Sequence, residues 1–229
     1  TIDDAEALRR APYATASVPV VQGNADADAI TLTQMVDLTG HTRLLGFGGK
    51  DVITIDRQPT LVTTHDRPDH KFRDGVTDGV VRDTIDVDGG ERADRVIVNV
   101  VGDGETDVLI NVVDSGAPND GGDELTINGT DRGDLADTVP ADTFLLRENF
   151  VAYLYATGTD ADGFMQYQSA VERVNYDRSI NGRLIVNAGD GNDEFYVDDN
   201  SAITTLDGGK GKDRFQIGQV FGTNPNGYT

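Results

Sequence analysis

Two glycine- and aspartate-rich loops near the C-terminus carry the residue types that bind calcium. The first is 188–195 (AGDGNDEF) and the second is 208–215 (GGKGKDRF), 20 residues further along the chain. Glycines let the backbone turn tightly and aim carbonyl oxygens at one point. Each loop also ends in a carboxylate, and calcium takes about six to eight oxygen ligands. The loops predict one shared calcium site, formed by Gly189, Asp190, Gly191, Asn192, Asp193, Gly208, Gly209, Gly211 and Asp213.

Two fainter copies of the loop lie further upstream. Residues 46–51 (GFGGKD) include Gly49 and Asp51, and residues 102–107 (GDGETD) include Asp103 and Asp107 with one extra residue. These four residues are weaker candidate calcium ligands. The alternative for every copy is a tight turn in which the aspartate caps backbone amides without an ion.

The C-terminal pair resembles the GGxGxDxU repeat of RTX (hemolysin-type calcium-binding) proteins over about residues 184–219. The resemblance implies a parallel β-roll, calcium held between neighbouring turns, and folding delayed until export because cytosolic calcium is low. This chain departs from the RTX pattern at Ala188, which replaces the first glycine, and at Lys210 and Lys212, which lower the local negative charge. Only one side of the coil carries obvious motifs, which favours a single site over a row of ions.

A second pattern runs along most of the chain, in which an aspartate precedes residues that alternate between apolar and polar. It starts at Asp28, Asp51, Asp83, Asp94, Asp107, Asp123, Asp142, Asp193 and Asp213. Each copy predicts a short strand after a turn. Several steps lie near 20 residues, so we expect an all-β, parallel β-solenoid that is β-roll-like with irregular coils. The alternative is a β-sandwich followed by a short C-terminal β-roll.

These patterns divide the chain into two regions. Residues 1–180 are expected to form an irregular β-solenoid or β domain, with a short helix over 3–10 as an N-terminal cap. Residues 181–229 are expected to form RTX-like calcium-binding coils. Degenerate coils are expected around 151–155 (VAYLY) and 171–176 (VERVNY). Neither end resembles a natural terminus, so we expect a piece of a longer protein.

Composition limits the partners. There are 19 basic and 40 acidic residues, for a net charge of −21, which argues against nucleic acid and anionic membranes. No apolar run is long enough for a membrane span, and the absence of cysteine excludes disulfides and thiol catalysis. Aspartate supplies 33 of the 40 acids. Oxygen-ligand loops account for that bias, and a halophilic surface is the alternative.

The chain lacks HExxH, GxSxG and P-loop patterns, so we expect no enzyme. The predicted function is a structural or interaction segment of a large secreted or cell-surface bacterial protein, of the adhesin, surface-layer or matrix-fibre type. Calcium would stabilise it, and its ends could stack on copies of itself or on neighbouring repeats to form filaments. The alternative is a polysaccharide-binding accessory module of a secreted enzyme, with Tyr153, Tyr155, Tyr167 and Tyr176 as candidate contacts. A β-helix lyase or epimerase is a third, less favoured candidate.

Overall fold

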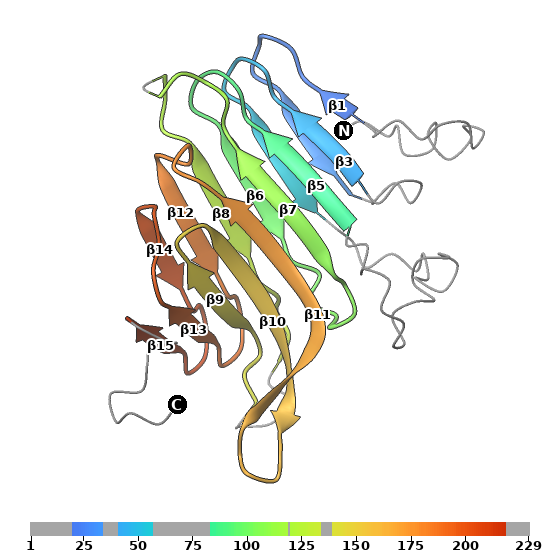
Figure 1. Ribbon diagram of the computed structural model, residues 1–229, viewed down its shortest axis with the longest axis vertical. Coiled ribbons are helices and arrows are strands. Elements are labelled where there is room, and N and C mark those ends of the chain that lie inside the picture. The colour runs from blue at the N-terminus through green and yellow to red at the C-terminus, as the bar shows by residue number, and fades with distance from the viewer. Residues whose placement is uncertain (1–19, 34–40, 57–82, 119, 134–138, 219–229) are drawn as a thin grey trace, which may run out of the picture.

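The computed structural model describes residues 20–33, 41–56, 83–118, 120–133 and 139–218 (Figure 1). This part of the chain contains strands and turns and no helix. The expected N-terminal helix over 3–10 lies outside the described residues.

The strands form two sheets. Sheet A has the order β1 (Val20–Gln22), β3 (His41–Leu45), β5 (Asp83–Asp88), β7 (Val108–Val113), β11 (Met165–Tyr176), β10 (Phe150–Thr159), β9 (Thr143–Arg147), β13 (Glu194–Val197) and β15 (Arg214–Ile217). Sheet B has the order β14 (Thr204–Asp207), β12 (Arg183–Asn187), β8 (Glu124–Asn128), β6 (Arg95–Asn99), β4 (Val52–Asp56) and β2 (Ala29–Leu32).

The chain passes from one sheet to the other and back, so that each coil adds strands in parallel beside those of the coil before. Strand β2 pairs with β4, β4 with β6, β6 with β8 and β8 with β12, all in parallel. Sheet A behaves in the same way from β1 to β7. The expected all-β parallel solenoid is therefore confirmed. Both sheets also continue across residue 180, because β12 pairs with β8 and β13 pairs with β9, and both β8 and β9 precede this residue in the chain.

The alternation of apolar and polar residues explains the core. In sheet B the register places Ile30, Ile53, Val96, Leu125 and Leu184 beside one another in a single row across the strands. Each of these side chains is at most 3% exposed, because alternate residues of a strand face the same side of the sheet. Outside the core, an amide ladder ties the same strands together: Asn187 donates to Asn128 at 2.9 Å, and Asn128 donates to Asn99 at 2.8 Å.

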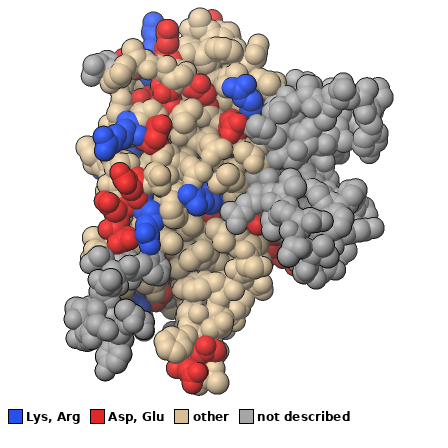
Figure 2. Space-filling model, viewed as in Figure 1, with Lys and Arg blue, Asp and Glu red and all other residues tan. Residues whose placement is uncertain are grey.

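One antiparallel hairpin interrupts the parallel sheet A. The segments 151–155 and 171–176, expected to be degenerate coils, belong to β10 and β11, which pair with each other in antiparallel register. Strand β10 also pairs antiparallel with β9. The far end of this hairpin projects beyond the sheets (Figure 1), and the space-filling view shows acidic side chains gathered at its tip, where Asp160 and Asp162 are exposed (Figure 2).

The buried rows predict that substitution of two different isoleucines has very different effects on the stability of the fold. We expect Ile53→Ala to lower the free energy of unfolding by about 2–5 kcal/mol, because Ile53 is 0% exposed and its removal leaves a cavity. The control Ile203→Ala should cost less than about 0.5 kcal/mol, since Ile203 is 65% exposed. Urea unfolding followed by circular dichroism measures both, and equal losses would contradict the described core.

Candidate metal centre

The turns that lead from sheet A to sheet B stack into a column of aspartates. Each turn ends in an aspartate just before the sheet B strand: Asp28, Asp51, Asp94 and Asp123. The backbone N–H of Asp28 donates to Asp51 Oδ1 at 2.7 Å, that of Asp51 to Asp94 Oδ1 at 2.7 Å, and that of Asp94 to Asp123 Oδ1 at 3.0 Å. Each carboxylate therefore ties its own coil to the coil before it.

The fourth turn adds a further carboxylate to this column. The first turn position after the sheet A strand is Gly23, Gly46 or Gly89 in the first three turns, and it is Asp114 in the fourth. A Cβ placed on Gly89 would lie 2.7 Å from Asp94 Oδ2 and 2.9 Å from Asp114 Oδ2. Both oxygens thus lie against the bare Cα of Gly89, and only glycine leaves room for them.

Three carboxylates converge at this point, those of Asp94, Asp114 and Asp123. Each offers one oxygen, and the three oxygens lie within 4.8 Å of one another. Asp94 and Asp123 are 4% and 3% exposed, and Asp114 is partly buried. The Oδ2 atoms of Asp94 and Asp114 are buried and accept no hydrogen bond from the described residues. Asp120 lies near them. Its Oδ1 is also buried and accepts no hydrogen bond from the described residues, while its Oδ2 accepts hydrogen bonds from the Arg92 and Ala117 amides.

The negative charges of the cluster repel one another. Burial, reinforced by the charges of Asp51, Asp123 and Asp120, raises the pKa of Asp94 to about 6. Burial, reinforced by the charges of Asp123 and Asp94, raises the pKa of Asp114 to about 7. A buried, charged carboxylate without a partner raises the free energy of the folded state. Either protonation or the binding of a cation therefore stabilises the cluster. All of these side-chain ligands are oxygens, which suits a hard divalent ion. The cluster can therefore hold a metal ion.

The predicted C-terminal loops lie at the opposite edge, in turns from sheet B to sheet A. The structure brings the two loops together, one coil apart, through a parallel bridge between Asp190 and Lys210. The amide of Asp193 donates to Asp213 Oδ1 at 3.2 Å, and the amide of Lys212 donates to Asn192 Oδ1 at 2.8 Å. Lys210 Nζ contacts both carboxylate oxygens of Asp190, at 2.9 and 2.8 Å. Calcium binding by this pair stays a prediction, in which calcium competes with Lys210 for Asp190.

Glycines allow these two loops to stack closely. A Cβ on Gly209 would lie 1.9 Å from the carbonyl oxygen of Gly189, and a Cβ on Gly211 would lie 1.7 Å from that of Gly191. Gly209 and Gly211 also have positive φ angles of 76° and 137°, a region that glycine adopts without strain. The glycines of the predicted loops therefore serve the stacking of the coils whether or not an ion binds.

The weaker candidates fall in two separate places. Gly49 and Asp51 lie in the turn before β4, where Asp51 is 1% exposed and belongs to the same aspartate column as Asp94. Asp103 and Asp107 lie in the turn between β6 and β7, at the edge that also carries the C-terminal pair. Asp103 Oδ1 accepts hydrogen bonds from the amides of Glu105 and Thr106, which matches the alternative of a capped turn.

Sequence reasoning missed Asp114 and Asp120 entirely, and it assigned Asp94 and Asp123 only to the starts of strands. Aligning the turns would place Asp114 where the other turns have glycine. The fourth turn spans 114–123, whereas the third spans 89–94, and this extra length hides the correspondence.

Comparison with known proteins assigns neither a family nor a function to this chain. No family model, curated protein or solved structure matches this chain. The described residues contain no helix that is long and apolar enough to cross a membrane. The RTX resemblance of 184–219 therefore stays an expectation.

The raised pKa values predict a distinct dependence of stability on pH without metal. In the folded state Asp94 and Asp114 keep protons to about pH 6 and 7, whereas in the unfolded chain they release them near 3.8. The folded state binds more protons in this window, so stability falls as pH rises from about 4 to 7. In chelator, we expect the melting temperature of Asp114→Asn to fall less steeply than that of the wild type, as measured by circular dichroism.

The control for this experiment is Asp162→Asn. Asp162 is exposed at the hairpin tip, so this variant loses the same charge outside the cluster and should keep the wild-type slope. Identical slopes for Asp114→Asn and the wild type would show that Asp114 does not carry the effect.

Proposed function

We propose that this chain is a non-enzymatic structural and interaction segment of a large secreted or cell-surface bacterial protein, such as an adhesin, a surface layer or a matrix fibre. In this proposal calcium stabilises its β-solenoid. The observation that carries the proposal is the cluster of Asp94, Asp114 and Asp123, whose oxygens lie within 4.8 Å of one another inside the column that connects the coils.

Calcium suits this cluster better than magnesium. Magnesium demands near-octahedral geometry and keeps several of its waters, whereas calcium accepts about six to eight oxygens in flexible arrangements. The cluster is partly buried. A Cβ placed on Gly116 would contact the Gly90 carbonyl oxygen as well as Asp114 Oδ1 and Asp120 Oδ2, so a carbonyl oxygen lies near these carboxylates. A net charge of −21 also attracts cations to the surface as a whole.

Calcium at the cluster would couple binding to folding. The ion would replace the protons on Asp94 and Asp114, cancel the repulsion among the carboxylates, and connect the 89–94 turn to the 114–123 turn. Binding to the folded state alone stabilises that state by mass action. Extracellular calcium sites of modest affinity fill at about 10⁻⁴–10⁻³ M, so such a segment would be most stable after export.

The proposal also includes self-association through the ends of the solenoid, and the outer strands support it. Phe144, Phe195 and Phe215 stack in a row, with ring centroids 5.6 and 4.8 Å apart. Phe215 and Ile217 of the outermost strand β15 are 45% and 73% exposed. A further parallel strand, from another copy or a neighbouring repeat, would extend the sheet and cover these side chains.

The tyrosine row proposed for a polysaccharide-binding module finds little support. Tyr153 and Tyr176 are 3% exposed and belong to the core. The Arg132 guanidinium lies 3.9 Å from the centre of the Tyr155 ring. Of the four candidates, Tyr167 is the most accessible, at 37% exposed, so these residues form no continuous aromatic platform.

Calcium titration tests the proposal. Isothermal calorimetry on the wild type should give a saturable calcium signal, and calcium should raise the melting temperature where sodium chloride of equal ionic strength does not. We expect Asp94→Asn to lose binding at the cluster while Oδ1 still accepts the Asp51 amide. Gly89→Ala should also lose it without removing charge, because its methyl group would crowd both free oxygens.

Asp162→Asn serves again as the charge-matched control and should titrate like the wild type. If sodium chloride alone reproduces the stabilisation, the acidity reflects a halophilic surface, and the calcium proposal fails.

A protease experiment tests the C-terminal pair separately. Lys210 is exposed in the second loop, with Lys212 two residues further on, and trypsin cleaves after both. If the pair holds calcium, chelation should accelerate cleavage at these lysines several-fold, and the cleavage sites can be read by mass spectrometry. Equal cleavage with calcium and with chelator would contradict calcium binding by residues 184–219.

A further inference from the structure

The two sheets differ in strand number, and the difference opens a hollow at one edge of the solenoid. In sheet B, β12 and β14 are direct neighbours, about 4.8 Å apart. In sheet A the corresponding strands β11 and β13 are separated by β10 and β9, hence by about 14 Å. The turns 177–182 and 198–203 therefore start far apart on sheet A and converge on sheet B. A wedge is left between them.

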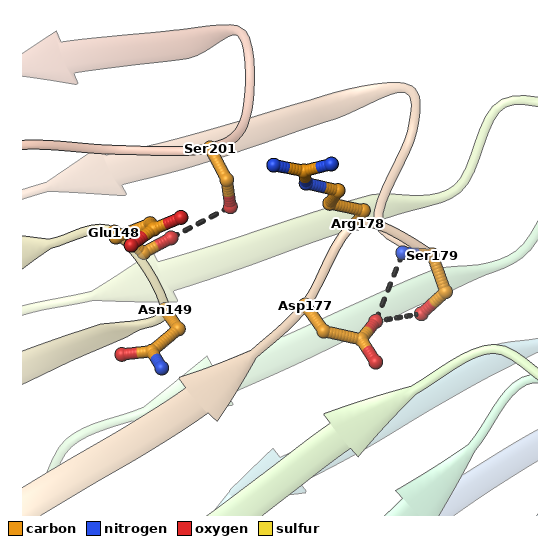
Figure 3. Close-up of a pocket in the computed structure, with 6 residues that line it drawn as sticks. All are labelled: Glu148, Asn149, Asp177, Arg178, Ser179 and Ser201. Atoms are coloured by element: carbon orange, nitrogen blue, oxygen red, sulfur yellow. Dashed lines mark hydrogen bonds between the residues drawn. The ribbon is translucent and has the colours of Figure 1, made fainter.

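The wedge is a hollow of about 420 Å³, lined by Glu148, Asn149, Asp177, Arg178, Ser179 and Ser201 (Figure 3). We call it the wedge pocket. Its volume falls within the roughly 300–1,000 Å³ of small-molecule sites. Its lining comes from three chain segments: the β9–β10 turn, the turn after β11 and the turn after β13.

Hydrogen bonds hold the three segments in place. The amide and hydroxyl of Ser201 donate to the Glu148 carbonyl at 3.2 and 2.6 Å, and the Tyr176 amide donates to the Asn149 carbonyl at 3.0 Å. The amide and hydroxyl of Ser179 both donate to Asp177 Oδ1. These hydrogen bonds therefore preorganise the backbone around the pocket for a ligand.

Most of the charged and amide groups of the lining stay available to a ligand. The Glu148 carboxylate, the Asn149 amide and the Arg178 guanidinium make no hydrogen bond to the other residues of the lining (Figure 3). Arg178 points from its turn towards Ser201 (Figure 3). The pocket thus offers strong acceptors and strong donors side by side.

This mixture selects an uncharged ligand rich in hydroxyl groups. Two carboxylates would repel a phosphate or a uronic acid, and the Arg178 guanidinium would repel a simple cation. A sugar hydroxyl both donates and accepts hydrogen bonds, so neighbouring hydroxyls can satisfy an acid and a guanidinium together. The lining contains no aromatic ring, so polar contacts must supply the recognition.

We propose that the wedge pocket binds one residue of a neutral saccharide. The Glu148 and Asp177 carboxylates accept hydrogen bonds from its hydroxyls, and the Arg178 guanidinium and Asn149 amide donate to it. This binding goes beyond calcium stabilisation and uses none of the clustered aspartates. The two sites are neighbours, because the Asp114 amide donates to Ser179 Oγ at 2.9 Å.

The test is saturation-transfer-difference NMR on the whole chain in saturating calcium. The probes are the methyl glycosides of glucose, galactose and mannose, with glucuronic acid and glucosamine as anionic and cationic comparisons. At least one neutral glycoside should give a saturable signal. Arg178→Leu and Asp177→Asn should each weaken it about tenfold or more, the loss expected for one hydrogen bond to a charged group.

Arg183→Leu is the matched control. Arg183 is exposed on β12 outside the pocket, where it donates to Thr205 Oγ1, so its loss should leave saccharide binding unchanged. Melting curves and calcium isotherms of each variant show whether the fold and the metal site survive, so failure of this proposal is separable from failure of the calcium proposal. The proposal is overturned if no neutral glycoside binds, if only glucuronic acid or glucosamine binds, or if the pocket variants bind as the wild type does.

Discussion

The hydrogen bond from a turn amide to the aspartate of the next coil is the contact on which the structure depends. Three such bonds run along the first edge, from Asp28 to Asp123, and the series ends there because the Asp123 amide donates to the side-chain amide oxygen of Asn181. Two more bonds to aspartate run along the opposite edge, from Asp142 to Asp213. Each one satisfies a turn amide, fixes the register of two coils and draws a carboxylate inside. The same bond uses only one of the two carboxylate oxygens. The acidic interior, and its attraction for a cation, is therefore a consequence of how the coils are joined.

The antiparallel hairpin marks where the aspartate column changes edge. The column occupies the turns from sheet A to sheet B as far as Asp123, and from Asp142 onward it occupies the turns from sheet B to sheet A. The hairpin supplies side chains that satisfy polar groups at this change. Tyr153 donates to the buried Asp142 at 2.8 Å, and Glu172 accepts from the amides of Val101 and Gly102 at 2.9 and 2.7 Å. The insertion is thus integrated into the core while it widens sheet A.

The candidate metal centre and the wedge pocket both result from irregularity in a regular scaffold. The metal cluster forms where one turn is longer and begins with Asp114 in place of glycine, so that an additional carboxylate enters the column. The wedge pocket forms where two extra strands in sheet A spread the turns apart. The two sites share one edge, and the 114–123 turn contacts the 177–182 turn through Ser179 and Asn181. Regular coils provide the rigid frame, and departures from regularity provide the sites.

The sequence by itself determined the strands and the chemistry of the turns. Alternation after each aspartate predicts a half-buried strand because side chains of a strand point to opposite faces in turn, and all nine predicted copies lie at strands. It could not show which aspartates meet, because successive members of the column are 23, 43 and 29 residues apart. Local pattern also could not reveal the direction of β10 or the approach of Asp114 to Asp94. Those outcomes depend on which strands pair, and pairing is decided by long-range packing of the coils.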